Sequence, residues 1–512
     1  MIKGQVVSGD FSKIAARVKH GEKIELGELV VIDNNDEKFI LQVYDLVYSS
    51  QISQQNLEMV SGLNLEENSN FQIMDAQLRN YQLALLKPIL NIGKNSKTCK
   101  KLPAFFSNIR EIAKEDLQFI TKPKNPFYLG KLRSGSKQLD LEIFLPGKDV
   151  FSHHVLIPAS TGKGKSNLMS TILWDCHDKD FVGTLVLDPH DEYYGRVGLG
   201  LKDHNSKDKL AYYTPVNPPP GAKTLKFNLK TLKPEHFQGA ISLSDPQRQC
   251  LYVYYKIFGE QWIKSILEER KIEGVSFHPD TVAVVKRKLI SLLQIEMQQG
   301  QVVCQGIFDE IAGENTIREI CRELEEAKTV IIDTSYFSGA LEIMIGGIIA
   351  NEALSLYKYY KKNALLDQKP VISIVLEEAP RVLGKKVLEQ GTNIFDTIAR
   401  EGRKFKVGLV AITQLPSEIP KNILANMNTK IILGIEMGSE RQAVMESSSQ
   451  DLSQDSRNIA SLDKGEALVS STFTRFAVPI KIPFFPEFVK EREAQEGASS
   501  SEVSQSYPGV GF

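Results

Sequence analysis

A glycine-rich segment at residues 159–166 has the residue types needed to bind phosphate. It reads ASTGKGKS, follows the apolar run HHVLIP and precedes a helical pattern at 167–176. Phosphates bind where backbone N–H groups converge in such a turn. The start of the following helix adds a favourable dipole. Ala159 replaces the glycine usual at the first position of this motif. The segment predicts a nucleotide-binding loop made of Thr161, Gly162, Lys163, Gly164, Lys165, Ser166 and Asn167.

Two carboxylates, Glu377 and Glu378, end the apolar run at 371–376. In an extended backbone neighbouring side chains point to opposite faces, so the two acids should have separate roles. We expect Glu377 to hold Mg²⁺ together with the Ser166 hydroxyl, and Glu378 to polarise an attacking water. Lys165 is expected to reach the β- and γ-phosphates. Glu377 replaces the more usual aspartate of such sites.

Further polar residues adjoin other apolar runs of the chain. Asp188 ends one run and Gln414 follows another, so both fall at the strand edge where open α/β sheets bind ligands. Gln414 is expected to sense the γ-phosphate through its amide. Arg400 and Arg403 precede the run that Gln414 follows, which places them near the opposite edge. They are poor candidates for their own subunit's nucleotide, and either pair on the surface or complete a neighbour's site.

The pattern of apolar runs predicts the elements that position these residues. Seven runs are continuous in Val, Ile and Leu, as expected for strands buried on both faces, at 155–157, 184–187, 329–332, 371–376, 407–413, 430–435 and 466–470. Helical patterns between them favour a parallel α/β sheet. Residues 233–327 carry helical spacing at 247–270, 280–299 and 316–328 without a strand candidate. We interpret them as a helical insertion.

The chain before this core reads as short strands. Residues 4–8, 24–33, 39–48 and 71–86 are extended in pattern, with an Asn-Asn-Asp turn at 34–36, and together predict a small N-terminal β-barrel. The predicted organisation is a barrel at 1–92, a connector at 93–125, an ATPase core at 126–232 and 328–486, the insertion at 233–327 and a flexible tail at 487–512. The basic residues of the connector either are solvated or contact an acidic partner.

Composition limits the classes of protein to consider. The 512 residues carry 62 Lys and Arg against 63 Asp and Glu, a net charge of −1, so any nucleic-acid binding requires local positive charge. Five cysteines without a C-x-x-C pair argue against a zinc site and a disulfide framework. The N-terminus lacks the apolar core of a signal peptide, and the most apolar helical pattern is too short and too polar to span a bilayer. We expect a cytoplasmic protein that makes no membrane contact.

Four motifs in this order make the chain resemble the HerA family of hexameric DNA-translocating ATPases, which is related to FtsK-type pumps. They are HHVLIPASTGKGKS, VLDPHDEYYG, VLEEAPRVLG and AREGRKFKVGLVAITQLPSEIP. The resemblance implies a RecA-like P-loop core behind a HAS-type barrel. It also implies that Glu378 is the catalytic glutamate, Asp188 the acid after the second strand and Gln414 the sensor. Arg403 would be the arginine that acts on a neighbour, with Arg400 as the second choice.

The same resemblance implies an assembly and partners. It predicts a homohexameric ring with ATP and Mg²⁺ between neighbours and double-stranded DNA in the pore. Lys385 and Lys386 either line that pore or are simply solvated. Relatives act with a NurA-like nuclease, or with another nuclease or a sirtuin-like effector in antiviral defence. The sequence outside the ATPase motifs contains no nuclease pattern of clustered acids or histidines.

Other functions fit the residues less well. One is a ring that binds ATP mainly to assemble and regulate an effector, which the altered Ala159 and Glu377 leave open. A membrane-anchored FtsK-like or conjugation pump is disfavoured, because we find no anchor. A small-molecule kinase is disfavoured as well, because nothing after the phosphate loop indicates an acceptor pocket. Together with the residues of the nucleotide site, the resemblance therefore implies an ATPase that moves or unwinds duplex DNA, in end processing or antiviral defence.

Overall fold

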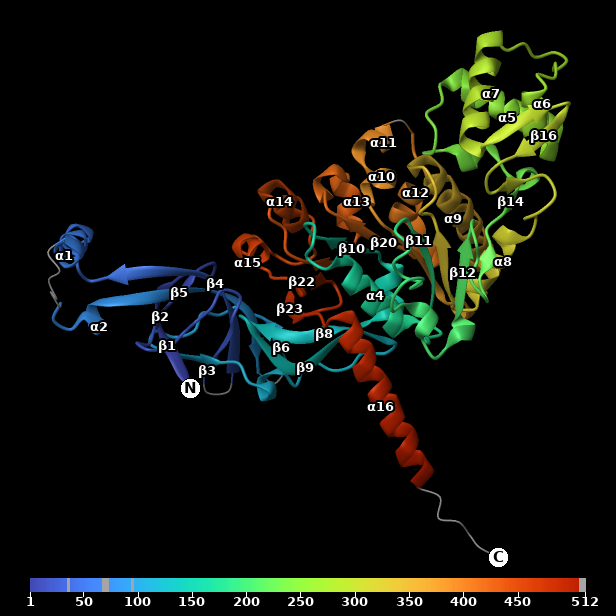
Figure 1. The fold of residues 1–512 in the computed structure, drawn as a ribbon. Coiled ribbons are helices and arrows are strands. Elements are labelled where there is room, and N and C mark those ends of the chain that lie inside the picture. The colour runs from blue at the N-terminus through green and yellow to red at the C-terminus, as the bar shows by residue number, and fades with distance from the viewer. Residues whose placement is uncertain (35–36, 67–72, 94–95, 390, 506–512) are drawn as a thin grey trace, which may run out of the picture.

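The computed structural model describes residues 1–34, 37–66, 73–93, 96–389 and 391–505. Figure 1 shows three parts along one elongated molecule: the barrel at one end, a central sheet with helices, and a helical lobe at the far end. Helix α16 projects away from the central part. The nucleotide-binding motifs all lie in the central part.

The central sheet is mixed, and its parallel half contains the predicted strands. Its order is β13-β12-β18-β11-β19-β20-β10-β21-β22-β23-β8-β9. Neighbours from β13 to β21 are parallel, and those from β21 to β9 are antiparallel. The strands are β8 (Pro126–Ser134), β9 (Lys137–Pro146), β10 (Val155–Pro158), β11 (Val182–Asp188), β12 (Leu210–Thr214), β13 (Lys223–Thr224), β18 (Thr329–Asp333), β19 (Val371–Leu376), β20 (Val407–Thr413), β21 (Thr429–Ile432), β22 (Glu466–Ser471) and β23 (Val478–Lys481).

The predicted α/β core is confirmed, with one correction at its edge. The seven predicted runs coincide with β10, β11, β18, β19, β20, β21 and β22. Of these, β22 runs antiparallel to β21, contrary to the expectation of an all-parallel set. A short turn leads from β22 into β23, which runs antiparallel to it, so the antiparallel part of the sheet begins at β22.

Helices cover both faces of this sheet. They are α3 (Gly147–Ser152), α4 (Lys165–Cys176), α8 (Thr316–Glu325), α9 (Gly339–Lys362), α10 (Pro380–Leu383), α11 (Lys385–Glu389), α12 (Ile394–Glu401), α13 (Lys421–Asn426), α14 (Gly438–Glu446) and α15 (Ser456–Ala460). Among the described residues, α9 is the one helix long and apolar enough to cross a membrane. Most of its apolar window is buried inside the protein, where Ile345, Ile348 and Ile349 belong to the main core.

The N-terminal barrel is closed, and it uses more chain than predicted. Its strands are β1 (Ile2–Gly9), β2 (Ile14–Val18), β3 (Leu29–Asn34), β4 (Glu37–Ser50), β5 (Asn80–Ile92) and β7 (Asn108–Glu111), with β6 (Ser96–Thr98) added on β5. β7 pairs with both β1 and β3, and β2 pairs with β5, which completes the ring. The predicted connector at 93–125 therefore contains β6 and β7. β7 was missed because Ile109 is its single apolar residue, although that side chain is fully buried.

The long strands β4 and β5 extend beyond the barrel as an arm. The arm carries α1 (Gln54–Glu66) and α2 (Ala76–Arg79) at its tip (Figure 1). α2 occupies part of the run at 71–86 that was predicted as a strand, because β5 begins only at Asn80. Residues 35–36 of the predicted turn, and the start of that run at 71–72, lie outside the described residues.

The insertion is not purely helical. Within the predicted bounds 233–327 lie α5 (Asp245–Phe258), α6 (Trp262–Leu267) and α7 (Pro279–Leu293), and α8 lies near the third helical pattern predicted there. The insertion also contains the hairpin β15 (Ile295–Gln298) and β16 (Gln301–Cys304), while β17 (Phe308–Asp309) pairs with β14 (Phe227–Asn228). The hairpin was missed because its strands have only four residues each and continue a helical pattern.

The predicted flexible tail is helical through Gln505. Helix α16 (Phe485–Gln505) begins against the core, where Phe488 and Val489 are buried. The Phe488 ring stacks on Tyr128 with centroids 5.3 Å apart, and the Arg492 guanidinium lies over both rings. These contacts fix the first turns of a segment whose composition alone indicated a loop.

A buried lysine holds strand β21 beside the phosphate loop. Lys430 is only 1% exposed, and its ammonium donates to the carbonyls of Leu424, Met427 and Ser447 at 3.0, 2.9 and 2.6 Å. No carboxylate of the described residues pairs with it. Burial lowers the pKa of Lys430 to about 7, because charge is costly away from water.

This environment predicts a pH-dependent contribution to stability. The unfolded chain keeps the Lys430 proton up to a pKa of about 10.4, so between about 7 and 10 it binds more protons than the folded protein. The free energy of unfolding should therefore rise with pH, at most by about 1.4 kcal/mol per pH unit from this group. Urea unfolding of Lys430→Met across this range should show a shallower slope. Lys421→Met, at an exposed position, should keep the wild-type slope, and an unchanged slope in Lys430→Met would contradict the assignment.

Candidate nucleotide site

The glycine-rich loop has the backbone that a phosphate cradle requires. Gly162 and Gly164 have φ of 78° and 102°, in the left-handed region that favours glycine. Gly164 ends the loop, and α4 begins at Lys165. Ala159 is buried and does not have a positive φ, so the alanine fits where the motif usually has glycine. The departure at Ala159 therefore leaves the turn intact.

Hydrogen bonds hold the loop between the ends of β20 and β21. The Ala159 N–H donates to the Thr413 carbonyl at 3.1 Å, and the Ser160 N–H donates to the Gly434 carbonyl at 2.9 Å. The Lys163 ammonium donates to the Leu462 carbonyl at 3.1 Å, so this side chain is already engaged beside the loop. The cradle is thus anchored to its neighbouring strands.

Lys165 faces the acidic pair. Its ammonium lies 3.5 Å from the Ala159 carbonyl oxygen, and the residue is partly buried at the start of α4. Burial lowers the pKa of Lys165, whereas the negative charges of Glu378 and Glu377 raise it. Ser166 follows on the first turn of the helix with an exposed side chain. The phosphate loop and the two glutamates therefore form one site.

The two glutamates diverge, although not through an extended backbone as predicted. Strand β19 ends at Leu376, and Glu378 has a φ of 50°, which is uncommon for a residue with a side chain. Glu377 accepts a hydrogen bond from the Tyr193 hydroxyl, on the β11 side. Glu378 accepts one from the Gln414 amide, on the β20 side, at 3.2 Å. A tight turn at the strand end thus separates the pair.

Gln414 connects Glu378 to the phosphate loop. Its side-chain oxygen accepts a hydrogen bond from the Thr161 hydroxyl at 2.6 Å, while its NH₂ group donates to Glu378. A carboxylate only accepts, which fixes the orientation of the Gln414 amide. Thr161, predicted to contact the nucleotide, thus also contacts the residue predicted to sense the γ-phosphate.

Asp188 is buried and organises the loop that follows β11. The side chain is 1% exposed and accepts from the backbone N–H groups of His190 and Tyr193 at 3.2 and 3.0 Å. Burial raises the pKa of Asp188 to about 6, against the opposing effect of these hydrogen bonds. Sequence reasoning did not assign Tyr193 a role. Its position in the DPHDEYYG motif was the available signal.

The predicted arginines lie at the opposite edge of the sheet. Arg400, on α12, donates to Asp396 on its own helix at 2.8 Å. Arg403 is exposed in the short segment before β20. It lies near His153, where its charge adds to the effect of burial in lowering the histidine pKa. Because Gln414 follows the same strand, β20 separates both arginines from their own phosphate loop.

Three other predicted residues are placed as follows. Lys385 donates to the Ser417 carbonyl at 2.8 Å, and Lys386 is exposed on α11. The Asn167 amide donates to the Pro483 carbonyl and accepts from the Phe485 N–H, at 2.9 and 2.8 Å. This side chain therefore anchors the segment leading to α16, which leaves only the Asn167 backbone facing the predicted phosphates.

The donor set fits Mg²⁺ held together with a nucleotide. No group of three or more His, Cys, Asp or Glu side chains among the described residues forms a metal cage. Mg²⁺ at nucleotide sites needs only one or two protein oxygens, since phosphates and water complete its shell. The Ser166 hydroxyl and the free Glu377 oxygen can supply these.

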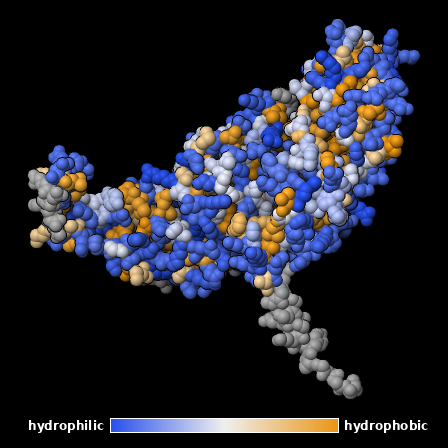
Figure 2. Space-filling model, viewed as in Figure 1, coloured by the Kyte–Doolittle hydropathy of each residue, from blue (hydrophilic) through white to orange (hydrophobic). Residues whose placement is uncertain are grey.

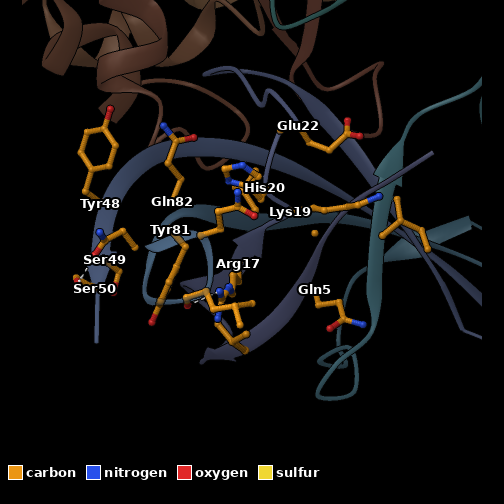
Figure 3. A pocket seen from close by; sticks show the side chains of 18 of the residues that line it. Gln5, Arg17, Lys19, His20, Glu22, Tyr48, Ser49, Ser50, Tyr81 and Gln82 are labelled. Atoms are coloured by element: carbon orange, nitrogen blue, oxygen red, sulfur yellow. Dashed lines mark hydrogen bonds between the residues drawn. The ribbon is translucent and has the colours of Figure 1, made fainter. Parts of the chain in front are cut away.

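A second concave region lies on the barrel, far along the chain from these motifs. This cleft of about 1360 Å³ is lined by β1, β2 and the arm. Arg17, from β2, donates to the Leu78 carbonyl at 2.7 Å and lies over the Tyr81 ring (Figure 3). Apolar side chains also reach the surface of this part of the molecule (Figure 2). The lining is rich in amides and aromatic rings, which suits binding more than catalysis.

Fold and site together define a P-loop ATPase. A family model described as "Helicase HerA, central domain" matches residues 127–353. The DNA double-strand break repair helicase HerA of Sulfurisphaera tokodaii is 25% identical, covering 95% of this chain and 93% of that protein. Its counterpart in Saccharolobus solfataricus is 24% identical over the same shares. The resemblance stated from the sequence is confirmed: this chain is an ATPase that is similar to HerA helicases over most of its length.

Solved structures were compared as well. The bacterial conjugative coupling protein TrwB aligns over 73% of this chain and 92% of its own, with a TM-score of 0.46 and 13% identity. A TrwB structure in complex with ADP and Mg²⁺ aligns with a TM-score of 0.45 and 14% identity over 71% of this chain and 95% of its own.

The Gln414 bridge yields a prediction about turnover. Gln414→Ala should lower kcat for ATP by about tenfold to a hundredfold, because Glu378 and the phosphate loop lose their shared hydrogen-bond partner. Nucleotide affinity, measured with a fluorescent ATP analogue, should change little. Gln442→Ala on α14, which removes only a contact with Glu446, is the control. Equal losses of kcat and affinity in Gln414→Ala would show that the residue only supports the loop.

Proposed function

We propose that this protein is an ATP-driven translocase and helicase for double-stranded DNA that works as a homohexameric ring. The observation that supports this most directly is the division of the predicted catalytic residues between two edges of one sheet. Lys165, Glu378 and Gln414 meet at one edge, while Arg403 is exposed at the other. Each subunit would therefore contribute one half of a nucleotide site at each of these two edges, and two neighbours together would complete a site.

At the first edge the residues act on ATP. Backbone N–H groups of 161–167 bind the phosphates, and Lys165 neutralises the β- and γ-oxygens. Ser166 and Glu377 hold Mg²⁺, which would offset the charge that develops on the phosphates. Glu378 polarises the attacking water. Gln414 senses the γ-phosphate through its hydrogen bond with Thr161.

The second edge acts on the nucleotide of the adjacent subunit. Arg403 has no ion pair within the described chain, in contrast to Arg400, which is bound to Asp396. An exposed guanidinium inserted into the neighbouring site would stabilise the transition-state charge. We therefore assign this role to Arg403 and keep Arg400 as the second choice.

A ring also supplies the positive charge that DNA binding needs. The chain has a net charge of −1, yet six copies of exposed Lys386, with Lys385 beside it, would concentrate positive potential in a central channel. Lysines that line such a channel would contact the DNA phosphates without recognising the base sequence.

We further propose that the ring acts in the cytoplasm with a separate effector protein. Following the family resemblance, this partner is a NurA-like or other nuclease, or a sirtuin-like enzyme, in DNA end processing or antiviral defence. The alternative is a hexameric scaffold that binds ATP to regulate its effector with little motor activity. The hydrogen-bonded Glu378–Gln414–Thr161 arrangement favours the motor.

The direct test is ATP hydrolysis by the purified chain with and without linear duplex DNA, alongside its mass in solution. The motor predicts a ring whose turnover rises with DNA. A ring that binds ATP and ignores DNA would instead support the scaffold. A monomer that hydrolyses ATP on its own would contradict both.

The assignment of Arg403 predicts complementation between two inactive variants. Lys165→Ala should abolish hydrolysis, and Arg403→Ala should lower kcat by about a thousandfold while sparing nucleotide binding. Mixed rings of the two should regain activity, because some interfaces pair an intact Lys165 with an intact Arg403. Lys404→Ala, at the next exposed position, is the control. Absence of recovery in verified mixed rings would place Arg403 outside the neighbour's site.

A further inference from the structure

Tyr193 lies between two acids of the nucleotide site and contacts both. Its hydroxyl donates to one oxygen of the Glu377 carboxylate, and its backbone N–H donates to Asp188 at 3.0 Å. The side chain is 2% exposed and belongs to the core beside β11. Because this phenol is buried, its hydroxyl has little access to another hydrogen-bond acceptor.

The loop that presents Tyr193 is fixed from both sides. Asp188 accepts from two of its backbone N–H groups, so neither carboxylate oxygen faces the site unpaired. Asp191 has a φ of 52°, receives a hydrogen bond from Tyr212 at 2.8 Å and forms an ion pair with Arg196, whose Nε lies 2.9 Å away. Asp188 thus acts on the site through the loop rather than by direct contact.

The Tyr193 hydroxyl fixes the orientation of the Glu377 carboxylate just beyond the end of β19. A metal-binding carboxylate depends on such hydrogen-bond partners to present its remaining oxygen in one direction. The phenol occupies one oxygen and leaves the other for the metal.

We propose that Tyr193 is a positioning residue that holds Glu377 for Mg²⁺, and that Asp188 serves the metal through Tyr193. This inference rests on the proposed use of Mg²⁺ and ATP. It differs from the expectation that Asp188 takes part in catalysis itself. Partners that orient a metal-binding carboxylate commonly contribute about tenfold to metal affinity or more.

The experiment compares Tyr193→Phe with Tyr194→Phe. Both remove one hydroxyl, but the Tyr194 ring stacks on Tyr212 and its hydroxyl makes no hydrogen bond within the described residues. Tyr193→Phe should raise the Mg²⁺ concentration for half-maximal ATP hydrolysis by about tenfold. It should weaken binding of a fluorescent ATP analogue with Mg²⁺, but not with EDTA. Tyr194→Phe should match the wild type in all three measurements.

A double-mutant cycle separates positioning from a merely structural role. In a Glu377→Gln background, Tyr193→Phe should add little further loss of Mg²⁺-dependent binding, because the carboxylate it positions is gone. The same additional loss in both backgrounds would overturn the proposal, as would an unchanged Mg²⁺ dependence in an active Tyr193→Phe protein. A wild-type chain that neither binds nor hydrolyses ATP would instead refute the proposed function.

If Tyr193→Phe folds poorly, Asp188→Asn provides a second route. The amide oxygen keeps one acceptor for the loop, whereas its NH₂ cannot accept the second N–H. Its Mg²⁺ requirement should shift in the same direction as that of Tyr193→Phe, with binding in EDTA preserved. A loss of binding that is independent of Mg²⁺ would show that Asp188 supports the nucleotide loop directly.

Discussion

The parallel hydrogen-bond register of β10, β20, β19 and β11 is the constraint on which the site depends. Pro158 pairs with Thr413, Ala411 with Leu376, and Leu376 with Leu187. These strands therefore end at nearly the same level, and the loops that follow them start side by side. Three of those loops carry the phosphate cradle, the glutamate pair and Gln414, and the fourth carries Tyr193. Ligand sites of open α/β sheets form at this edge for the same geometric reason.

Within this frame the central position of β19 explains the division of its two acids. β19 has β11 on one side and β20 on the other, so a turn at its end can direct neighbouring side chains to different loops. The left-handed backbone at Glu378 makes this turn possible and is the kind of local strain found at functional sites. Glu377 joins the loop after β11, and Glu378 joins the residue after β20. The two neighbouring residues are thus placed separately, as their proposed roles in metal binding and water activation require.

Elements outside the parallel sheet hold the site in place from two flanks. The Asn167 amide ties α4 to the segment entering α16, so the helix that follows the phosphate cradle also anchors the C-terminal part of the chain. On the other flank, Lys430 joins the ends of α13 and α14 to β21, whose continuation at Gly434 accepts from the phosphate loop. Motion of either flank would reach the cradle through these hydrogen bonds.

The sequence by itself determined the class of site, because its chemistry is local. A Gly-Lys-Ser turn between a strand and a helix, and glutamates or an amide directly after apolar runs, need only neighbouring residues to be recognised. The tertiary structure decided what depends on partners distant in the chain. Ile109 closes the barrel from a segment that reads as a linker, and helix α16 follows from the packing of Phe488 on Tyr128. Tyr193 meets Glu377 only because β11 and β19 are neighbours, and strand order in a parallel sheet is set by long-range packing that no local pattern encodes.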